Sequence, residues 1–383
     1  MTKYIDFQNA IDHSKQSRRL VFIDLMRAYA ILMMLQGHTV GTVLAPQFQD
    51  NSYTLYYIWS FMRGITAPVF FFSSGTIFAY LLLRKDIPFW QNERVTKGIK
   101  RAALLLFTGY LLRFNPYIIT NLNNFDVFSF QSSFAVDTLH CIGLGLLTLI
   151  FLYGLQRLIK FPVWISYPGL AAFLFLIYPQ VFHTNWLEIF PLPIANYFTA
   201  NFGSNFPIVP WMGFILFGGF FGFILSKSAG IAYNTKFSLL TIALGVVTSL
   251  FSGYILGEVY NVTKLEDFLY LQYHNVQFFH LGNVLIIFGI LSIIANKFKI
   301  PEFLSTVGKK TMMIYIVHVF IVYGTGINKG YRSLIGQTLD PYQTVVLAIV
   351  TVVFFIILAQ YTDKIKLLFN QYIWNKIKGK KTP

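Results

Sequence analysis

The first long apolar stretch constrains the fold most, because it is long enough to cross a bilayer and yet carries three ionisable side chains. It covers residues 18–44, RRLVFIDLMRAYAILMMLQGHTVGTVL. A membrane-spanning helix needs about 20 apolar residues, and an ionisable side chain at mid-membrane costs about 2.5–3.5 kcal/mol on insertion scales. On a helix that turns about 100° per residue, Asp24, Arg27 and His38 lie on one stripe. This alignment favours a functional site over the alternative, an Asp–Arg anchor at the membrane interface with an unrelated histidine.

Apolar segments of similar length follow along the whole chain. Of its residues, 55% are hydrophobic and only 12% are charged, whereas soluble proteins carry about 25% charged residues. We therefore predict an all-α, polytopic membrane protein with about ten transmembrane helices. The predicted segments are residues 20–43, 57–82, 101–121, 134–155, 162–178, 208–226, 237–256, 276–296, 311–327 and 342–362.

The lysines and arginines predict how these helices are oriented. If the N-terminus lies inside the cell, 24 of the 30 Lys and Arg residues fall in cytoplasmic segments, as the positive-inside rule requires. Both termini are then cytoplasmic, with an N-terminal segment (1–19), a transmembrane domain (20–362) and a basic tail (363–383). This topology and the attraction of basic residues to anionic membrane lipid account for the formal net charge of +15. No nucleic acid partner is needed to explain that charge.

Several predicted helices carry polar side chains to one depth, in the outer half of the membrane. Asp137 and His140 are three residues apart and therefore share one helix face. For any single residue of this set except His38, a polar helix–helix contact worth about 0.6–2 kcal/mol is the favoured interpretation. Taken as a group, they predict a polar cavity that opens outward. The set comprises His38, Arg63, Asp137, His140, His274, His280 and Asn283.

A basic cluster lies at the predicted cytoplasmic start of the third helix. Its members are Arg94, Lys97, Lys100 and Arg101. Side chains three or four residues apart can clamp a polyanion such as a nucleotide phosphate. The positive-inside rule accounts for the same residues without any ligand, so both interpretations stay open.

The sequence lacks the common metal and nucleotide motifs. Its seven histidines are scattered, without HxxxH or HExxH, and its single cysteine excludes an intramolecular disulfide. We therefore expect no metal. His318 stands alone among apolar residues and is interpreted as a packed, hydrogen-bonded core residue. Gly218 and Gly222 form a GxxxG motif, which predicts close helix packing and leaves association into a homodimer open.

Several segments resemble a superfamily of multispan membrane acyltransferases. Asp24 and Arg27, followed by His38, resemble the first-helix signature of the acyltransferase 3 family. Other segments are similar to a sister group, the bacterial relatives of heparan-alpha-glucosaminide N-acetyltransferase. Those segments are 66–75 (TAPVFFFSSG), 138–147 (TLHCIGLGLL), 206–222 (FPIVPWMGFILFGGFFG) and 307–319 (VGKKTMMIYIVHV). The resemblance extends over about residues 18–323.

The resemblance implies acyl transfer across the membrane, from cytoplasmic acyl-CoA, usually acetyl-CoA, to an extracytoplasmic sugar hydroxyl or amine. By analogy His38 is the catalytic histidine, and Asp24 and Arg27 support the first helix. The basic cluster occupies the place of an R-x-x-R pair in acyltransferase 3 proteins. Because a lysine follows Arg94 at the third position, that pair is not reproduced, which weakens the transfer of a CoA-binding role. His140 lies in a matching LH-x-x-G segment that does not fix its role.

The residue types suit this chemistry. A histidine has an unperturbed pKa of about 6.5 and can take a proton from a sugar hydroxyl or amine that attacks a thioester. Asp137 could orient such an imidazole, while Arg63 or Asn283 could stabilise the oxyanion. A covalent acyl-histidine and direct transfer are equally compatible with the sequence.

We therefore interpret the chain as a multi-pass acyltransferase of the cell inner (plasma) membrane, an O- or N-acetyltransferase that modifies a glycan or glycolipid of the cell envelope. The main alternative is a transporter or flippase for a solute or lipid-linked sugar. An enzyme should bind CoA at the basic loop, residues 84–101, whereas a transporter need not. A catalytically silent receptor fits less well, because it leaves His38 on the stripe of Asp24 and Arg27 unexplained.

Overall fold

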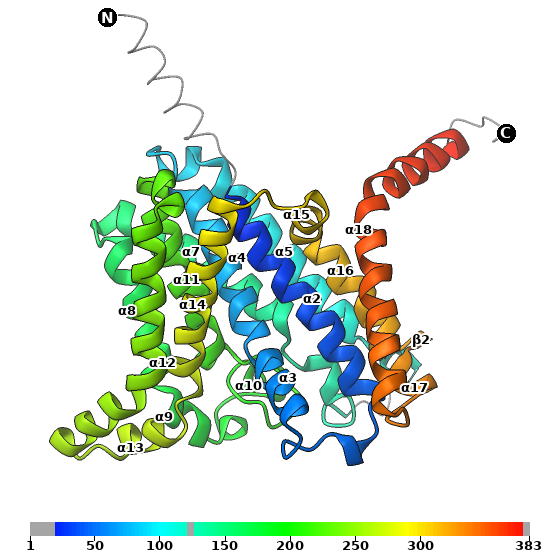
Figure 1. The fold of residues 1–383 in the computed structure, drawn as a ribbon, viewed down its shortest axis with the longest axis horizontal. Coiled ribbons are helices and arrows are strands. Elements are labelled where there is room, and N and C mark those ends of the chain that lie inside the picture. The colour runs from blue at the N-terminus through cyan, green and yellow to red at the C-terminus, as the bar shows by residue number, and fades with distance from the viewer. Residues whose placement is uncertain (1–19, 121–125, 378–383) are drawn as a thin grey trace, which may run out of the picture.

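The computed structural model describes residues 20–120 and 126–377, which form a bundle of long helices with one very short hairpin (Figure 1). The all-α prediction is confirmed. Residues 1–19 and the end of the predicted basic tail, 378–383, lie outside the described residues. The helices are α2 (Val21–Val43), α3 (Thr54–Gly64), α4 (Thr66–Leu83), α5 (Glu93–Arg113), α6 (Tyr117–Thr120), α7 (Thr138–Ile159), α8 (Val163–Leu176), α9 (Tyr178–His183), α10 (Leu192–Ala195), α11 (Ile208–Lys227), α12 (Thr235–Thr263), α13 (Glu266–Tyr273), α14 (Val276–Lys297), α15 (Glu302–Lys309), α16 (Thr311–His318), α17 (Tyr331–Leu334) and α18 (Pro341–Ile377). The hairpin pairs β1 (Gly324–Thr325) with β2 (Asn328–Lys329).

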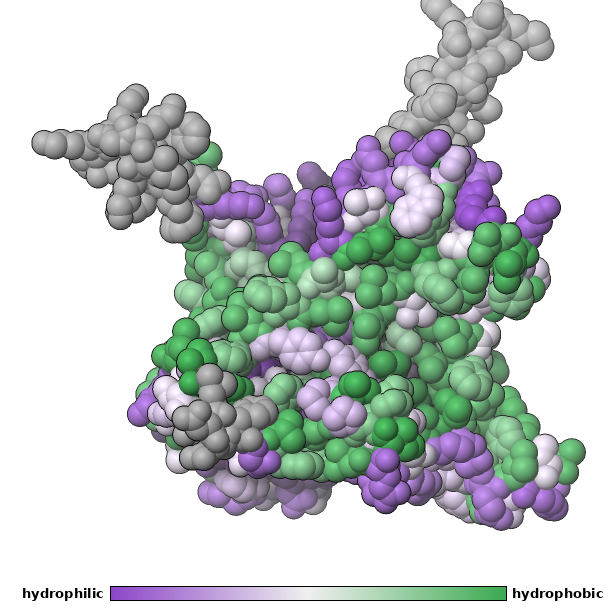
Figure 2. Space-filling view, turned by 180° about the vertical axis from the view of Figure 1, so that it is seen from behind, coloured by the Kyte–Doolittle hydropathy of each residue, from purple (hydrophilic) through white to green (hydrophobic). Residues whose placement is uncertain are grey.

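The helices are those of a multi-pass membrane protein. Within the described part of the chain, six are long and apolar enough to cross a membrane, or seven if the bent pair α15–α16 counts as one span. On the face shown in Figure 2, hydrophobic residues form a band across the middle of the molecule, between two hydrophilic ends. Each of the ten predicted segments contains a helix, but a total of ten spans remains a prediction.

The start of α2 and the far part of α18 lie at the same end of the molecule (Figure 1). At this end the ammonium group of Lys310, between α15 and α16, forms an ion pair with Asp363 of α18. The described segments that lie nearest to the two ends of the chain are therefore on the same side of the molecule. That this side is the cytoplasmic one remains a prediction.

Helices α4 and α11 are in backbone contact through glycines. A Cβ atom on Gly75 would lie 1.9 Å from the carbonyl oxygen of Ile215, and one on Gly218 would lie 2.0 Å from that of Phe72. A Cβ on Gly222 would likewise lie 2.4 Å from a carbonyl oxygen of α4. The GxxxG prediction of close packing is confirmed, and this packing is within one chain. A homodimer remains a prediction.

The bent pair α15–α16 packs along α2. Its two helices meet at 69°, and a Cβ on Gly308 would lie 2.0 Å from the backbone oxygen of Asp24. After α16 the chain continues through a π-helical turn, η7 (Val319–Tyr323), into the hairpin. This path carries the end of α16 and η7 to the second half of α2.

Candidate active site

A cavity of about 800 Å³ lies among α2, α4, α7 and the segment formed by α16 and η7. The first residues of α4, the last of α5 and the first of α7 line it, so it lies toward the end of the molecule opposite the start of α2. This is the predicted outer half. Arg63, Arg113, Asp137 and Arg332 are the charged residues among its lining.

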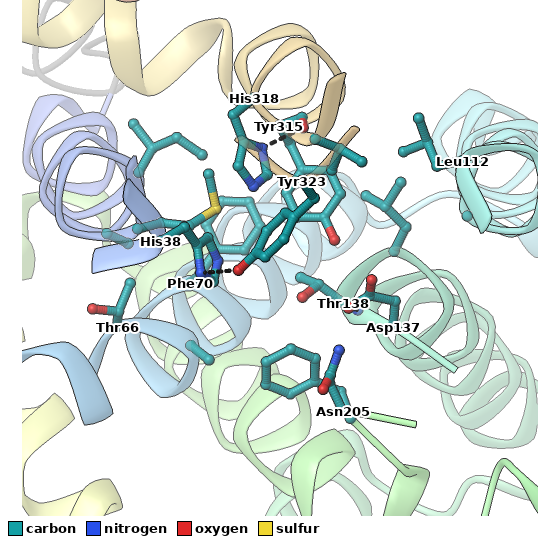
Figure 3. Close-up of a pocket in the computed structure, with 18 of the residues that line it drawn as sticks. His38, Thr66, Phe70, Leu112, Asp137, Thr138, Asn205, Tyr315, His318 and Tyr323 are labelled. Atoms are coloured by element: carbon teal, nitrogen blue, oxygen red, sulfur yellow. Dashed lines mark hydrogen bonds between the residues drawn. The ribbon is translucent and has the colours of Figure 1, made fainter. Parts of the chain in front are cut away.

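His38 is the predicted catalytic residue, and the cavity is built around it (Figure 3). Its Nδ1 atom lies 2.6 Å from the hydroxyl oxygen of Tyr323 at the end of η7. The imidazole of His318 stacks on it, with ring centroids 5.4 Å apart and planes 13° apart. His318 and Tyr323, which follow His38 by about 280 positions in the sequence, are therefore its direct neighbours in the cavity.

Arg63 also lies beside His38. Its side chain lies across the glycines of α2: a Cβ on Gly37 would lie 3.2 Å from its Cγ, and one on Gly41 would lie 3.4 Å from its Nη2. Its guanidinium is 5.5 Å from the ring centroid of Trp59, whose indole N–H donates to Gln36. Among the described residues Arg63 forms no ion pair. A positive charge is therefore held next to the imidazole.

Asp137 lines the cavity but is engaged in other contacts. Its carboxylate accepts a hydrogen bond from the backbone N–H of Thr138 at the start of α7 and forms an ion pair with Arg113 at 3.1 Å. Its backbone N–H donates to Nδ1 of His140, which completes a capping box. His140 is fully buried against Tyr110, with ring centroids 4.2 Å apart, and is absent from the cavity lining.

The structure does not bring His280 and Asn283 to the cavity. The amide of Asn283 donates to the carbonyl of Phe279 and to the hydroxyl of Ser249 on α12. His280 is near Gly64, where an added Cβ would lie 3.8 Å from its ring. Asn283 thus forms a polar contact between α14 and α12, which was the favoured interpretation for this residue taken singly.

Asp24 and Arg27 face the bent pair. The hydroxyl of Ser305 on α15 donates to Asp24 at 3.4 Å, and a guanidinium nitrogen of Arg27 donates to Thr311 at 2.5 Å. Together with the contacts of His38, these bonds show that the whole stripe of α2 faces one continuous partner segment. Asp24 and Arg27 fix the near part of that segment, and His38 meets its far part.

The basic cluster is at the other end of α5. All four side chains are exposed, and Lys97 pairs with Glu93 at 2.5 Å. Arg94 precedes the cavity residue Arg113 by 19 positions, or about 28 Å at about 1.5 Å per residue. The cluster therefore does not line the cavity.

The sequence interpretation missed the role of residues that reach the cavity from distant parts of the chain. His318 is 1% exposed and bonded to the carbonyl of Tyr315, as expected of a packed core residue, yet it also lines the cavity. Tyr323 and Arg332, which also line the cavity, were not predicted as site residues. The isolated histidine in an apolar helix was the one signal available.

Within the described ranges 20–120 and 126–377, no group of three or more His, Cys, Asp or Glu side chains could hold a metal ion. The titratable groups in the cavity lining are two imidazoles, two tyrosine hydroxyls, the carboxylate of Asp137 and three arginines.

Comparison with known proteins gives one match. A family model described as "Heparan-alpha-glucosaminide N-acetyltransferase, catalytic" matches residues 19–253. No curated protein and no solved structure matches the chain. The matched range includes α2 and its stripe, whereas the bent pair and Tyr323 lie beyond it.

Proposed function

Because the chain belongs to the heparan-alpha-glucosaminide N-acetyltransferase catalytic family, we propose that it is an acetyltransferase of the cell inner membrane that modifies an envelope glycan or glycolipid. The proposed donor is cytoplasmic acetyl-CoA. The proposed acceptor is a sugar hydroxyl or amine on the other side of the membrane. His38 is the proposed catalytic residue.

The position of His38 is the observation that carries this proposal. Ligand pockets usually measure about 300–1,000 Å³, and the cavity of about 800 Å³ in front of His38 has room for a sugar and an acyl group. The imidazole is held by Tyr323 at 2.6 Å and does not depend on a ligand for its orientation. The site is thus formed before any substrate arrives.

The surroundings of His38 suit acyl transfer. Attack of a hydroxyl or amine on a thioester moves one proton from the nucleophile and builds negative charge on the carbonyl oxygen. Imidazoles transfer protons near neutral pH, which contributes roughly 10²–10⁴-fold to a rate. Arg63, held beside His38, offers a positive charge to the oxyanion. Direct transfer and an acyl-histidine both fit this arrangement.

The basic cluster is the proposed contact for the CoA phosphates. Arg101 precedes the cavity residue Leu112 by eleven positions on α5, about 17 Å along the helix. The thioester of CoA lies at the far end of the molecule from its phosphates. A donor that enters along α5 can therefore keep its phosphates at the cluster while its acyl group approaches the cavity.

Transfer of labelled acetyl from acetyl-CoA tests the proposed activity. In vesicles with the purified protein, label added on the side of the basic cluster is expected on a glycan or glycolipid exposed on the opposite side. Vesicles without the protein are the control. Label that stays on CoA with every envelope glycan tried would contradict the proposed activity.

Thermal stabilisation by CoA tests the donor site and separates an enzyme from a transporter. CoA is expected to raise the unfolding temperature, since a ligand that binds only the folded state stabilises it by RT ln(1 + [L]/Kd). Arg101→Ala is expected to weaken this shift at least several-fold, because a charge-assisted contact to phosphate is lost. Lys236→Ala, which removes an exposed basic residue at the start of α12, should leave it unchanged. No shift with CoA in the wild type would favour a transporter.

A further inference from the structure

The two imidazoles of the cavity have different hydrogen-bond partners. His38 comes from α2, and His318 is the last residue of α16. Their rings stack at 5.4 Å between centroids, so both border the same space (Figure 3). A neutral histidine carries its proton on one nitrogen only, and the hydrogen bond of the other nitrogen determines which one.

The partner of His318 fixes its protonation. Its Nδ1 is hydrogen-bonded to the backbone carbonyl of Tyr315, and a carbonyl oxygen can only accept. Nδ1 therefore carries the proton, and Nε2 has a free lone pair. In Figure 3 this second nitrogen of His318 points into the cavity, on the side of His38 and Tyr323. His318 is thus arranged as a proton acceptor.

The partner of His38 favours the opposite arrangement. The Tyr323 hydroxyl lies 2.6 Å from Nδ1 of His38, and no other hydrogen bond of this hydroxyl is present among the described residues. If the hydroxyl donates, its proton has an acceptor; if it accepts, its own proton has no partner among the described residues, so donation is the favoured direction. Donation leaves Nδ1 of His38 unprotonated and places the proton on Nε2. His38 is thus arranged as a hydrogen-bond donor.

We propose that His318 is the catalytic base of the cavity and that His38 donates a hydrogen bond to the acyl oxygen. This division of roles rests on the proposed acetyl transfer and goes beyond it, because His318 then touches the acceptor directly. Tyr323 is a positioning residue that acts through His38. A neutral imidazole that polarises a carbonyl by hydrogen bonding is known chemistry for histidine.

The reaction balances with these two groups. The acceptor oxygen or nitrogen forms a bond to the thioester carbon while its proton passes to Nε2 of His318. The carbonyl π electrons move onto oxygen, which Nε2–H of His38 stabilises. When the carbonyl re-forms, the carbon–sulfur bond breaks and the thiolate takes the proton from His318. The products are the acetylated acceptor and CoA thiol, and both histidines return to their initial state.

Two matched substitutions separate the roles. Gln in place of His38 keeps an amide donor near the position of Nε2, whereas Asn in place of His318 keeps a donor to the Tyr315 carbonyl but removes the base. His38→Gln is expected to lower the transfer rate by less than about 10-fold, and His318→Asn by about 10²–10⁴-fold. Near wild-type activity of His318→Asn would show that His318 is only structural. A loss in His38→Gln as large as in His38→Ala would overturn the donor role.

The protonated nitrogen of each histidine can also be determined by spectroscopy on the wild-type protein, and this measurement does not require a variant to be active. Nitrogen NMR of histidine-labelled protein reports which ring nitrogen carries the proton, and His38→Gln and His318→Asn assign the two signals. The proposal expects a proton on Nδ1 of His318 and on Nε2 of His38, and a changed signal for His38 alone in Tyr323→Phe. The same protonated nitrogen in both rings would overturn it.

The transfer rates of the wild type and of His318→Asn distinguish the assigned roles of the two histidines from the proposed function. A wild-type protein that transfers no acetyl contradicts the function and the base role together. A wild-type protein that transfers acetyl, combined with a fully active His318→Asn variant, contradicts the base role alone. Equal unfolding temperatures for the variants and the wild type ensure that a lost rate is not a lost fold.

Discussion

Replacing His38 by alanine is expected to lower acetyl transfer by at least about 10²–10³-fold, the loss that follows removal of one preorganised donor to an oxyanion. The substitution removes the imidazole between the Tyr323 hydroxyl and the cavity, and no other side chain of α2 that lines the cavity, Ala30, Ile31 or Met34, can donate a hydrogen bond to the acyl oxygen. The measurement is the initial rate with labelled acetyl-CoA at saturating donor. Because the basic cluster is at the other end of α5, stabilisation by CoA should persist.

His274→Ala is the matched control for this experiment. It removes an exposed imidazole that stacks on Tyr270 outside the cavity, so its rate should equal that of the wild type. An unchanged rate in His38→Ala would show that the cavity histidine is not catalytic, whatever the effect of His274→Ala. Loss of activity in both variants would indicate a general loss of folded protein, which the unfolding temperature would reveal.

The features that depend on local sequence were predictable. Segment length and apolar content determine where helices form in a membrane protein, because every backbone group must be bonded within its own segment. The helical repeat was sufficient to place Asp24, Arg27 and His38 on one face. It could not show what that face contacts, since the bent pair follows some 280 residues later.

The position of a residue along its helix was predictable from the sequence, but the rotation of the helix about its axis was not. Asn283 is on a helix that passes the predicted depth, yet its amide turns toward Ser249 of α12 and not toward the cavity. Which side of α14 faces α12 is decided by backbone contact at Gly245 and Gly282, where a Cβ on either would lie 2.6 Å from the carbonyl oxygen of the other. Such close contacts depend on the whole bundle and leave no periodic signal.

The Asp137–His140 spacing had two valid interpretations. A separation of three residues puts both side chains on one helix face, and it is also the spacing of a capping box. The structure has the capping box, so the carboxylate serves the start of α7 and the ion pair with Arg113. A catalytic role for either residue remains a prediction. The contacts of His318 and Tyr323 with His38 arise only in the folded chain.

The close backbone contact between α4 and α11 at Gly218 predicts a large effect on stability. Gly218→Ala places a Cβ atom 2.0 Å from the carbonyl oxygen of Phe72, and a backbone atom cannot rotate away as a side chain does. Helices α4 and α11 must therefore separate, which disturbs the fully buried Phe71 and Phe72. Overpacking a core usually costs about 1–3 kcal/mol and occasionally more, and we expect about 3 kcal/mol or more here.

Gly169→Ala is the control, because an added Cβ has no neighbour within 4 Å there and alanine is favoured over glycine within a helix by about 1 kcal/mol. The unfolding temperature in detergent is expected to fall by several degrees in Gly218→Ala and to stay the same or rise in Gly169→Ala. Because α4 begins with Thr66, Ala67 and Phe70 in the cavity wall, the Gly218 variant should also lose acetyl transfer below its unfolding temperature. Equal unfolding temperatures for the two variants would mean that α4 and α11 are less closely packed than the structure indicates. The part of the cavity wall that α4 forms would then also be less closely packed.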